Sequence, residues 1–292
     1  MTPAARLRRR LSEGPILVAP GVPDALTARM AERVGFEALY FTGAGFSYTH
    51  LGAPDLGLVT LTETAWRVGS VVEATSLPVI VDADDGYGGP LNVIRAVRLL
   101  EAAGAAAIQI EDQVAPKRCG HLTGKQVVGV DVMTAKIRAA TDARRDPALV
   151  VVARTDAGAM EGLDAALERA QRYREAGADV LFVEAVRTLD ELARVARELP
   201  PPVMTNLVEG GLTPMVPARE LERMGYRLVI FPGSAVRAAA AAVLHTLEVL
   251  RRDGTTEAVR HRMLSFRELN ELLGLEDYRA REARYLGSDR GG

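Results

Sequence analysis

Short runs of apolar residues alternate along this chain with longer segments whose apolar positions recur at helical spacing. The short runs are apolar throughout rather than at every second position, which is typical of strands buried on both faces of a parallel sheet. The predicted strands cover residues 16–19, 38–42, 78–82, 107–111, 149–154, 180–184, 203–206 and 228–231. The predicted helices cover residues 24–34, 61–74, 92–103, 130–144, 163–176, 189–199, 218–224 and 235–251.

Eight strand–helix units within about 250 residues predict a (β/α)8 TIM barrel. No Gly-x-Gly-x-x-Gly sequence follows the first strand, which argues against a doubly wound dinucleotide-binding sheet. We expect residues 1–292 to form a single barrel domain with a C-terminal helical extension from about residue 256. That extension reads as two or three more helices, which we expect to pack on a neighbouring subunit or to cover one barrel end.

Composition narrows the classes of partner. The formal net charge is −2, so no electrostatic footprint for nucleic acid or an anionic membrane is visible. The basic N-terminus lacks the apolar stretch of a signal peptide, and the most apolar helical run, residues 238–250, is too short to span a bilayer. The single cysteine, Cys119, cannot form an internal disulfide, which fits a reducing cytoplasm. We therefore expect a cytoplasmic protein that binds a small molecule.

Polar residues follow almost every predicted strand from the second to the eighth. In a barrel, the carboxyl ends of the strands form the active face. The residues at these ends include Thr42, Gly43, Ala44, Asp82, Asp84, Glu111, Arg154, Glu184, Asn206 and Ser234. One such residue would be an ordinary turn former or helix cap, but their repetition at one end of the barrel predicts a shared active site.

Two aspartates suggest a metal. Asp82 and Asp84 lie two residues apart, so both project from one face of an extended segment. If they converge with Glu111 and Asp55, the carboxylates repel one another unless a cation lies between them. These are hard oxygen ligands without an accompanying histidine or cysteine, which favours Mg²⁺ or Mn²⁺ over Zn²⁺. The alternative interpretation of residues 82–86 is a polar turn.

Other residues at the same end are suited to binding anions. Arg154 can bind a carboxylate or phosphonate through two hydrogen bonds, or it can pair with Glu184 or Asp156. Residues 42–45 offer backbone N–H groups and a hydroxyl, which suit an anion, although the same residues also suit a tight turn. Two further candidates for binding a second carboxylate are Asn206 and Ser234.

The segment from Val114 to Lys125 reads V-A-P-K-R-C-G-H-L-T-G-K and follows a predicted strand. Its chemically active candidates are Lys117, Arg118, Cys119 and His121. Neighbouring positive charge favours the thiolate form of Cys119, so this thiol can transfer a proton near neutral pH. Gly120 and Gly124 make the segment pliable, as in mobile catalytic loops. The alternative is a solvated basic loop with an incidental thiol.

With these residues assembled, the chain resembles the isocitrate lyase/phosphoenolpyruvate mutase superfamily over nearly its full length. The motifs that carry the resemblance are P-G-V-P-D-A-L at 20–26, T-G-A-G at 42–45, G-A-P-D-L-G at 52–57, V-D-A-D-D-G-Y-G at 81–88, I-E-D-Q at 110–113, P-K-R-C-G-H at 116–121, A-R-T-D-A at 153–157 and N-L-V-E-G-G-L-T-P at 206–214. K-R-C-G-H is similar to the branch of 2-methylisocitrate lyase, dimethylmalate lyase and the petal-death protein. Carboxyvinyl-carboxyphosphonate phosphonomutase carries a similar motif.

The resemblance implies a barrel that exchanges its eighth helix with a partner, usually within a homotetramer. It implies Mg²⁺ near Asp82 and Asp84, helped through water by Asp55 and Glu111. The implied substrate-binding residues are Thr42, Gly43, Ala44, Arg154, Asn206 and Ser234, with Glu184 nearby. Cys119 would donate and accept the proton on a closing loop. The same loop carries the other implied catalytic residues, Lys117, Arg118 and His121.

The implied activity is Mg²⁺-dependent cleavage of a C–C bond in a 2-hydroxy dicarboxylic acid of the methylisocitrate or alkylmalate type. The products would be a 2-oxo acid and a carboxylic acid. The motifs leave open P–C bond chemistry of the phosphonomutase kind, and hydrolysis or decarboxylation of oxaloacetate. Three departures from the family pattern are Thr42-Gly-Ala, Asp85 and Phe231-Pro-Gly-Ser. They make a smaller or differently substituted malate as good a candidate as 2-methylisocitrate.

Overall fold

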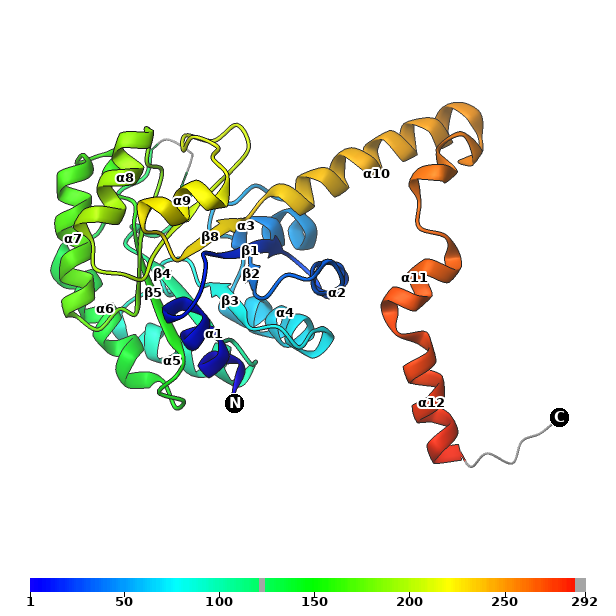
Figure 1. Ribbon diagram of the computed structural model, residues 1–292, viewed down its shortest axis with the longest axis horizontal. Helices are drawn as coiled ribbons and strands as arrows, with labels where there is room; N and C mark the ends of the chain where they lie inside the picture. Colours follow the sequence, from blue (N-terminus) through cyan, green and yellow to red (C-terminus); the bar gives the residue numbers. More distant parts are fainter. Residues whose placement is uncertain (121–123, 287–292) are drawn as a thin grey trace. The chain divides into compact units, whose positions relative to one another are not determined.

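The computed structural model describes residues 1–120 and 124–286. Eight parallel strands close into a barrel in sequence order (Figure 1). The strands are β1 (Leu17–Val22), β2 (Leu39–Phe41), β3 (Val79–Asp82), β4 (Ala107–Glu111), β5 (Val150–Thr155), β6 (Val180–Val183), β7 (Val203–Asn206) and β8 (Leu228–Phe231). Strand β8 pairs with β1, with Leu228 opposite Leu17, so the sheet has no free edge. The predicted (β/α)8 barrel is confirmed.

Helices cover the outside of the barrel (Figure 1). They are α2 (Ala25–Val34), α4 (Leu61–Ala74), α5 (Pro90–Ala102), α6 (Val130–Ala143), α7 (Leu163–Glu175), α8 (Leu189–Glu198) and α9 (Ala218–Met224). Strand and helix ends agree with the predicted ones to within three residues. Local sequence explains this agreement. The Asp24 side chain caps α2 by accepting a hydrogen bond from the Thr27 N–H at 2.7 Å, and Gly104 ends α5 with a φ of +96°, which favours glycine.

An N-terminal helix, α1 (Pro3–Ser12), was not predicted. Its apolar positions Ala4, Leu7 and Leu11 are buried and repeat at three- and four-residue spacing on one face. They pack in the same apolar cluster as residues at the amino ends of the strands, such as Leu17 and Val150. Helix α1 therefore covers the end of the barrel opposite the strand carboxyl ends. Its arginine-rich sequence hid the apolar face from the pattern analysis.

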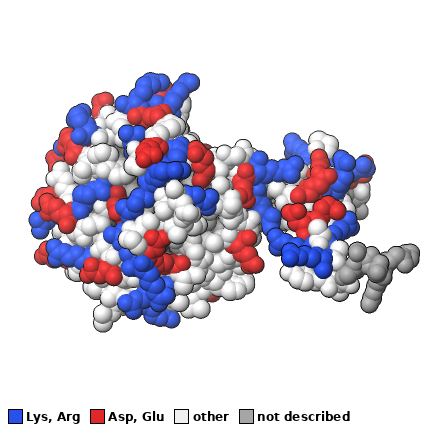
Figure 2. Space-filling view, turned by 60° about the horizontal axis from the view of Figure 1, so that its bottom comes forward, with Lys and Arg blue, Asp and Glu red and all other residues white. Residues whose placement is uncertain are grey.

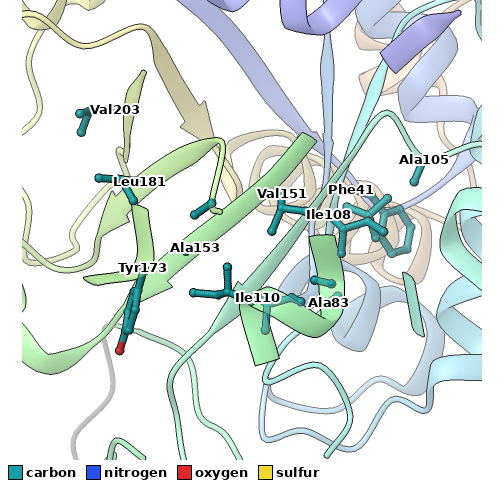
Figure 3. Close-up of a cluster of buried hydrophobic side chains, with 14 of the residues drawn as sticks. Phe41, Ala83, Ala105, Ile108, Ile110, Val151, Ala153, Tyr173, Leu181 and Val203 are labelled. Carbon is teal, nitrogen blue, oxygen red and sulfur yellow. The ribbon is translucent and has the colours of Figure 1, made fainter. Parts of the chain in front are cut away.

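Strand residues alternate between two apolar layers. The outward layer packs against the helices, and Figure 3 shows part of it, including Phe41, Ile108, Val151 and Leu181. The inward layer fills the barrel and includes Tyr40, Ile80, Val152, Phe182 and Met204. Side chains two residues apart along a strand share a face. Two residues beyond an inward-facing residue, each of five strands therefore turns another side chain inward, and all five are polar. They are Asp82, Glu111, Arg154, Glu184 and Asn206, which follow Ile80, Gln109, Val152, Phe182 and Met204. The two-residue period of the strands thus places five polar side chains at the carboxyl end of the barrel.

The chain divides into two compact units, Met1–Val236 and Arg237–Gly292. The boundary falls early in α10 (Ser234–Asp253), and the second unit also holds a 3₁₀-helix (Glu257–Arg262), α11 (Phe266–Leu273) and α12 (Leu275–Leu286). The further helices expected near the C-terminus are therefore present. The single barrel domain with an extension from about residue 256, and the exchange of a helix with a partner, stay predictions.

Charge and hydropathy of the described residues add two facts. Positive and negative side chains are intermixed over the face shown in Figure 2, so that face carries no extended field of one sign. Among the described helices, none combines the length and the apolar character that crossing a membrane requires.

Candidate active site

The first cluster of polar side chains contains three aspartates and one lysine. The Lys117 ammonium lies 2.5 Å from Asp55 Oδ1 and 2.7 Å from Asp84 Oδ1. Asp82 Oδ1 accepts hydrogen bonds from the Asp84 N–H at 3.2 Å and from Gln109 Nε2 at 3.3 Å. The predicted metal ligands, Asp55 among them, thus come together. Lys117 provides a cation from the chain itself.

Asp55 reaches this cluster through an irregular segment that the sequence pattern did not predict. Short helix α3 (Gly43–Phe46) runs into a π-helix (Ser47–Leu51). The Ser47 hydroxyl donates to the carbonyl oxygens of Ala53 at 3.0 Å and Pro54 at 3.1 Å. These hydrogen bonds fold the chain back and fix the position of Asp55.

Burial controls the electrostatics of the first cluster. Burial raises the pKa of Asp84 to about 7; Lys117 opposes the rise, and the Asp82 and Asp55 carboxylates add to it. Burial by itself lowers the pKa of Lys117, but Asp84, Asp55 and other carboxylates outweigh it and raise that pKa well above its ordinary value. Asp84 Oδ1 lies 2.7 Å from Lys117 Nζ, and a carboxylate oxygen can accept from more than one partner. The ion-paired Asp84 carboxylate therefore still has lone pairs for another partner.

The first cluster fits a small hard cation. A cavity of about 10 Å³ is lined by Gly43, Asp55, Asp82 and Asp84, among other residues. A Cβ on Gly43 would lie 2.9 Å from Asp82 Oδ2 and 3.3 Å from Asp84 Oδ1, so a side chain there would intrude on the carboxylates. Within the described ranges, no three His, Cys, Asp or Glu side chains form a ready-made metal site. Two carboxylates suffice for Mg²⁺, because it usually keeps waters and takes substrate oxygens.

The second cluster surrounds Arg154. The guanidinium donates to Asp156 from Nε at 2.9 Å and from Nη2 at 3.0 Å. Its Nη1 lies 3.3 Å from Glu111 Oε2, and its Nε lies 3.7 Å from Glu184 Oε2. Asn206 Nδ2 donates to both Glu184 oxygens, at 3.1 and 3.2 Å. Four residues predicted from separate strand ends, Glu111, Arg154, Glu184 and Asn206, are therefore neighbours. The residue that Arg154 binds through two hydrogen bonds is Asp156.

Two cations, Arg154 and Lys125, face the three carboxylates of the second cluster. Burial lowers the pKa of Arg154, but the carboxylates, Asp156 and Glu111 first, raise it well above its ordinary value. Burial raises the pKa of Asp156, yet Arg154 and Lys125 bring it below its ordinary value. Burial raises the pKa of Glu111 well above its ordinary value, with Arg154 opposing. Glu111 Oε1 and Asn206 Oδ1 are buried and accept no hydrogen bond from the described residues, so both can receive one from a ligand or water.

The cysteine segment is fastened to the barrel by its backbone. Gln113 Nε2 donates to the Arg118 carbonyl at 2.8 Å, and the Arg118 N–H donates to Gln113 Oε1 at 2.9 Å. The Cys119 N–H donates to the Asp55 carbonyl at 3.2 Å. Cys119 is partly exposed and is not in a disulfide. Its backbone is therefore bound to the first cluster.

Gly120 lies against the second cluster. A Cβ on Gly120 would lie 2.4 Å from Arg154 Nη2 and 2.6 Å from Glu184 Oε1. Only glycine permits this approach of the backbone. Gly120 was interpreted as a source of pliability, but the structure shows that close contact requires it here. Cys119 thus precedes, by one residue, the point where the segment meets Arg154.

Some predicted residues make other contacts. The Thr42 hydroxyl accepts a hydrogen bond from the Gly45 N–H at 3.1 Å and caps α3, which also contains Ala44. The Ser234 hydroxyl donates to Glu209 Oε1 at 2.5 Å. His121 lies outside the described residues. Their substrate-binding or catalytic roles stay predictions.

Three residues that contact these clusters received no role from the sequence. They are Gln109, Gln113 and Lys125. Gln109 precedes Glu111 by two residues in β4, so the strand period could have placed it on the inward face. Lys125 is one of only three lysines in the chain, a scarcity that could have drawn attention to it. The contacts of Gln113 with the Arg118 backbone depend on the path of the loop, which sequence patterns do not predict.

Comparison with known proteins agrees with this geometry. A sequence model of the phosphoenolpyruvate phosphomutase family matches residues 7–251. This chain belongs to that family. The family's 2,3-dimethylmalate lyase of Eubacterium barkeri is 45% identical to this chain over 285 residues, which cover 98% of this chain and 99% of that protein. The 2-methylisocitrate lyase of Aeropyrum pernix is 45% identical over 281 residues, covering 96% and 90%. The expected superfamily and enzyme class, a carbon–carbon lyase, are confirmed.

Solved structures of family members share the whole fold. A 2,3-dimethylmalate lyase structure matches with a TM-score of 0.93 at 39% identity, covering 100% of this chain and 99% of the other. Oxaloacetate acetylhydrolase with 3,3-difluorooxalacetate matches with a TM-score of 0.92 at 36% identity, covering 98% and 97%. Phosphonopyruvate hydrolase with oxalate and Mg²⁺ matches with a TM-score of 0.88 at 33% identity, covering 98% and 100%.

Proposed function

We propose that this enzyme is a Mg²⁺-dependent lyase that cleaves a C–C bond of an alkyl-substituted malate or of a methylisocitrate-type acid. The products are a 2-oxo acid and a carboxylic acid. The main support is the arrangement of groups at the carboxyl end of the barrel. Two carboxylates that can bind a cation lie on one side and the buried Arg154 guanidinium lies on the other, and the Cys119–Gly120 backbone contacts both. The identity of 45% to 2,3-dimethylmalate lyase supports this substrate class.

Mg²⁺, or Mn²⁺ in its place, would be held by Asp82 and Asp84, with Asp55 and Glu111 acting through water. When bound, the cation supplies positive charge that polarises the oxygen on C2 of the substrate. The buried carboxylate oxygens and the cavity beside Gly43 support this assignment. The Mg²⁺ in the phosphonopyruvate hydrolase structure supports it as well.

In this proposal the chain's own side chains bind and orient the dicarboxylate. Arg154 and Asn206 hold one carboxylate, and Glu184 keeps the Asn206 amide in place. The backbone N–H groups of residues 42–44 and the Ser234 hydroxyl contact the remaining polar groups. Residues 118–120 exclude water from the reacting carbon, which strengthens these charge interactions.

The proton transfers are assigned as follows. Glu111, whose Oε1 is buried without a hydrogen-bond partner among the described residues, takes up the proton of the 2-hydroxyl. The C2–C3 bond then breaks, its electron pair stays on C3, and C2 becomes the carbonyl carbon of the 2-oxo acid. Cys119 Sγ–H donates its proton to C3 and completes the carboxylic acid. Lys117, Arg118 and His121 are the further catalytic residues that the proposal assigns to this segment.

A substrate panel followed by NMR tests the proposal. It holds 2,3-dimethylmalate, 2-methylisocitrate, oxaloacetate and phosphonopyruvate, each with Mg²⁺ and with EDTA. We expect Mg²⁺-dependent pyruvate and a carboxylic acid from at least one of the two substituted acids. Oxalate from oxaloacetate or phosphate from phosphonopyruvate would indicate a hydrolase, and phosphoenolpyruvate from phosphonopyruvate would indicate a mutase. Any of these products, with no cleavage of either substituted acid, would contradict the lyase.

The proposal extends to assembly and location. We place the enzyme in the cytoplasm. We also propose that it is a homotetramer in which the second compact unit, which begins at Arg237 (unit 2), contacts other copies of the chain. Exposed apolar residues of α10, Val243, Leu244, Leu247 and Leu250, support the assembly, because contiguous exposed apolar side chains mark interaction surfaces. The lone thiol supports the location.

A further inference from the structure

All three lysines of this chain are buried beside carboxylates. Lys117, Lys125 and Lys136 are the only lysines in the sequence, and they are 6%, 8% and 4% exposed. Lys117 pairs with the aspartates of the first cluster. Lys125 lies 3.0 Å from Asp156 Oδ1, and Lys136 donates to the Asp85 carbonyl at 2.8 Å. The cations that cover the surface in Figure 2 are accordingly arginines. A lysine carries a compact ammonium that can bond several oxygens at once, whereas an arginine carries a planar fork.

Lys125 differs from the other two lysines in what it joins. Its ammonium donates to the Gly120 carbonyl and to Asp156 Oδ1 at 3.0 Å. The same Asp156 oxygen accepts the hydrogen bond from Arg154 Nη2 at 3.0 Å. One carboxylate oxygen therefore connects the ammonium to the guanidinium, and the ammonium connects both to the backbone next to Cys119.

Asp156 is itself fixed by the barrel. It is fully buried, and its N–H donates to Asp112 Oδ1 at 2.9 Å. Removing one cation from a buried carboxylate is strongly destabilising, because part of its charge loses its partner. Loss of the ammonium would free the Gly120 carbonyl and leave Arg154 as the sole cation on Asp156.

We propose that Lys125 is a positioning residue that, through the Gly120 carbonyl and Asp156, fixes Cys119–Gly120 and Arg154 in one mutual arrangement. The inference depends on the proposed function only for the roles of Cys119 and Arg154. The Lys125 ammonium then fixes the positions of both the proton donor, Cys119, and the carboxylate-binding group, Arg154. Displacement of Lys125 disturbs both groups together.

The test compares Lys125→Met with the matched control Lys136→Met, which removes a second buried ammonium from the same end of the barrel. The readout is the alkylation of Cys119, the only thiol, by iodoacetamide across a pH series. The limiting rate at high pH reports access to the thiol separately from its ionisation. This measurement needs no substrate, so its outcome is independent of whether the lyase proposal holds.

We expect Lys125→Met to raise the limiting alkylation rate about tenfold or more, because loss of a charge-assisted hydrogen bond loosens the segment. Lys136→Met should stay within about twofold of the wild type. A folded Lys125→Met protein that alkylates at the wild-type rate would overturn the proposal, and so would an equal rise in both variants.

A measurement on the unaltered protein covers the case in which Lys125→Met does not fold. Reductive dimethylation is followed by mass spectrometry in the native protein and in urea. We expect Lys125 to be protected in the native state to within about tenfold of Lys136, since both amines are buried. If Lys125 reacts in the native protein at its unfolded rate, the bond to Gly120 is not maintained in solution and the proposal is wrong.

Discussion

At the scale of single residues, Gly120 shows how strictly the site is constrained. Its backbone approaches Arg154 and Glu184 so closely that a single added carbon would lie 2.4 Å from Arg154 Nη2. Arg154 cannot retreat easily, because Asp156 holds it through two hydrogen bonds. The sequence alone predicts only that Gly120 makes the segment pliable, because a glycine in a sequence indicates conformational freedom but not which atoms lie next to it.

Gly120→Ala should therefore lower kcat/KM by about 100-fold, the effect of a misplacement of roughly 1 Å. The matched control is Gly69→Ala in α4, where a Cβ meets nothing within 4 Å. Steady-state kinetics and thermal unfolding of both variants provide the measurement. Gly120→Ala with wild-type kcat/KM would show that the contact with Arg154 does not persist during turnover.

Cys119→Ser should lower kcat by at least about 100-fold, because a serine hydroxyl is a much weaker acid than a thiol at neutral pH. Mg²⁺ affinity should not change, since the substitution keeps the backbone N–H that donates to the Asp55 carbonyl. Single-turnover kinetics together with calorimetric Mg²⁺ titration measure the two effects. Turnover close to that of the wild type would rule out the thiol as the proton donor.

At the scale of elements, neighbouring residues of one strand end have separate tasks. Glu111 faces the barrel mouth, whereas Asp112 faces outward and joins β4, β5 and α7. Asp112 accepts hydrogen bonds from the Thr155 hydroxyl at 2.7 Å, the Tyr173 hydroxyl at 2.8 Å and the Asp156 N–H at 2.9 Å. The strand period predicts that the two side chains point apart, but not which partners they meet.

Asp112→Asn should lower the free energy of unfolding by about 1–3 kcal/mol, because an amide nitrogen cannot accept the hydrogen bonds that reach Asp112 Oδ2. Urea unfolding measures the change. The control is Asp142→Asn, an exposed aspartate of α6, which should stay within about 0.5 kcal/mol. An unchanged unfolding midpoint in Asp112→Asn would mean that the network contributes little to stability.

The sequence predicted the barrel because its strands are continuously apolar and end in polar residues. Asp82, Glu111, Arg154, Glu184 and Asn206 were identified from that pattern alone. Two kinds of feature were missed. The apolar face of α1 was hidden among arginines, and the path of residues 118–120 depends on side chains that bind the backbone from distant positions. Such contacts have no periodic signature.

At the scale of the whole molecule, α10 carries an apolar stripe. Val243, Leu244, Leu247 and Leu250 recur at helical spacing and are 42–61% exposed. A stripe of this kind normally packs against another surface. No buried residue belongs to α11 or α12 as described, so unit 2 has little apolar core of its own. Contacts with other copies of the chain are the proposed explanation.

Light scattering should therefore give a mass near four times the 31.3 kDa of one chain. Leu247→Glu should dissociate the assembly, because it would place a charge within an apolar interface. Glu248→Gln, an exposed change in the same helix, should leave the mass unaltered. A single-chain mass for the wild type at micromolar concentration would contradict the assembly.

The most direct test of the central claim is the cleavage of 2,3-dimethylmalate in D₂O, followed by proton NMR with Mg²⁺ and then with EDTA. The account predicts equal amounts of pyruvate and singly deuterated propionate with Mg²⁺, and neither product with EDTA. Cys119→Ser should give neither product at the wild-type rate. Sustained cleavage in EDTA would contradict the metal site. If 2-methylisocitrate is also left intact with Mg²⁺, the absence of pyruvate would contradict the lyase itself.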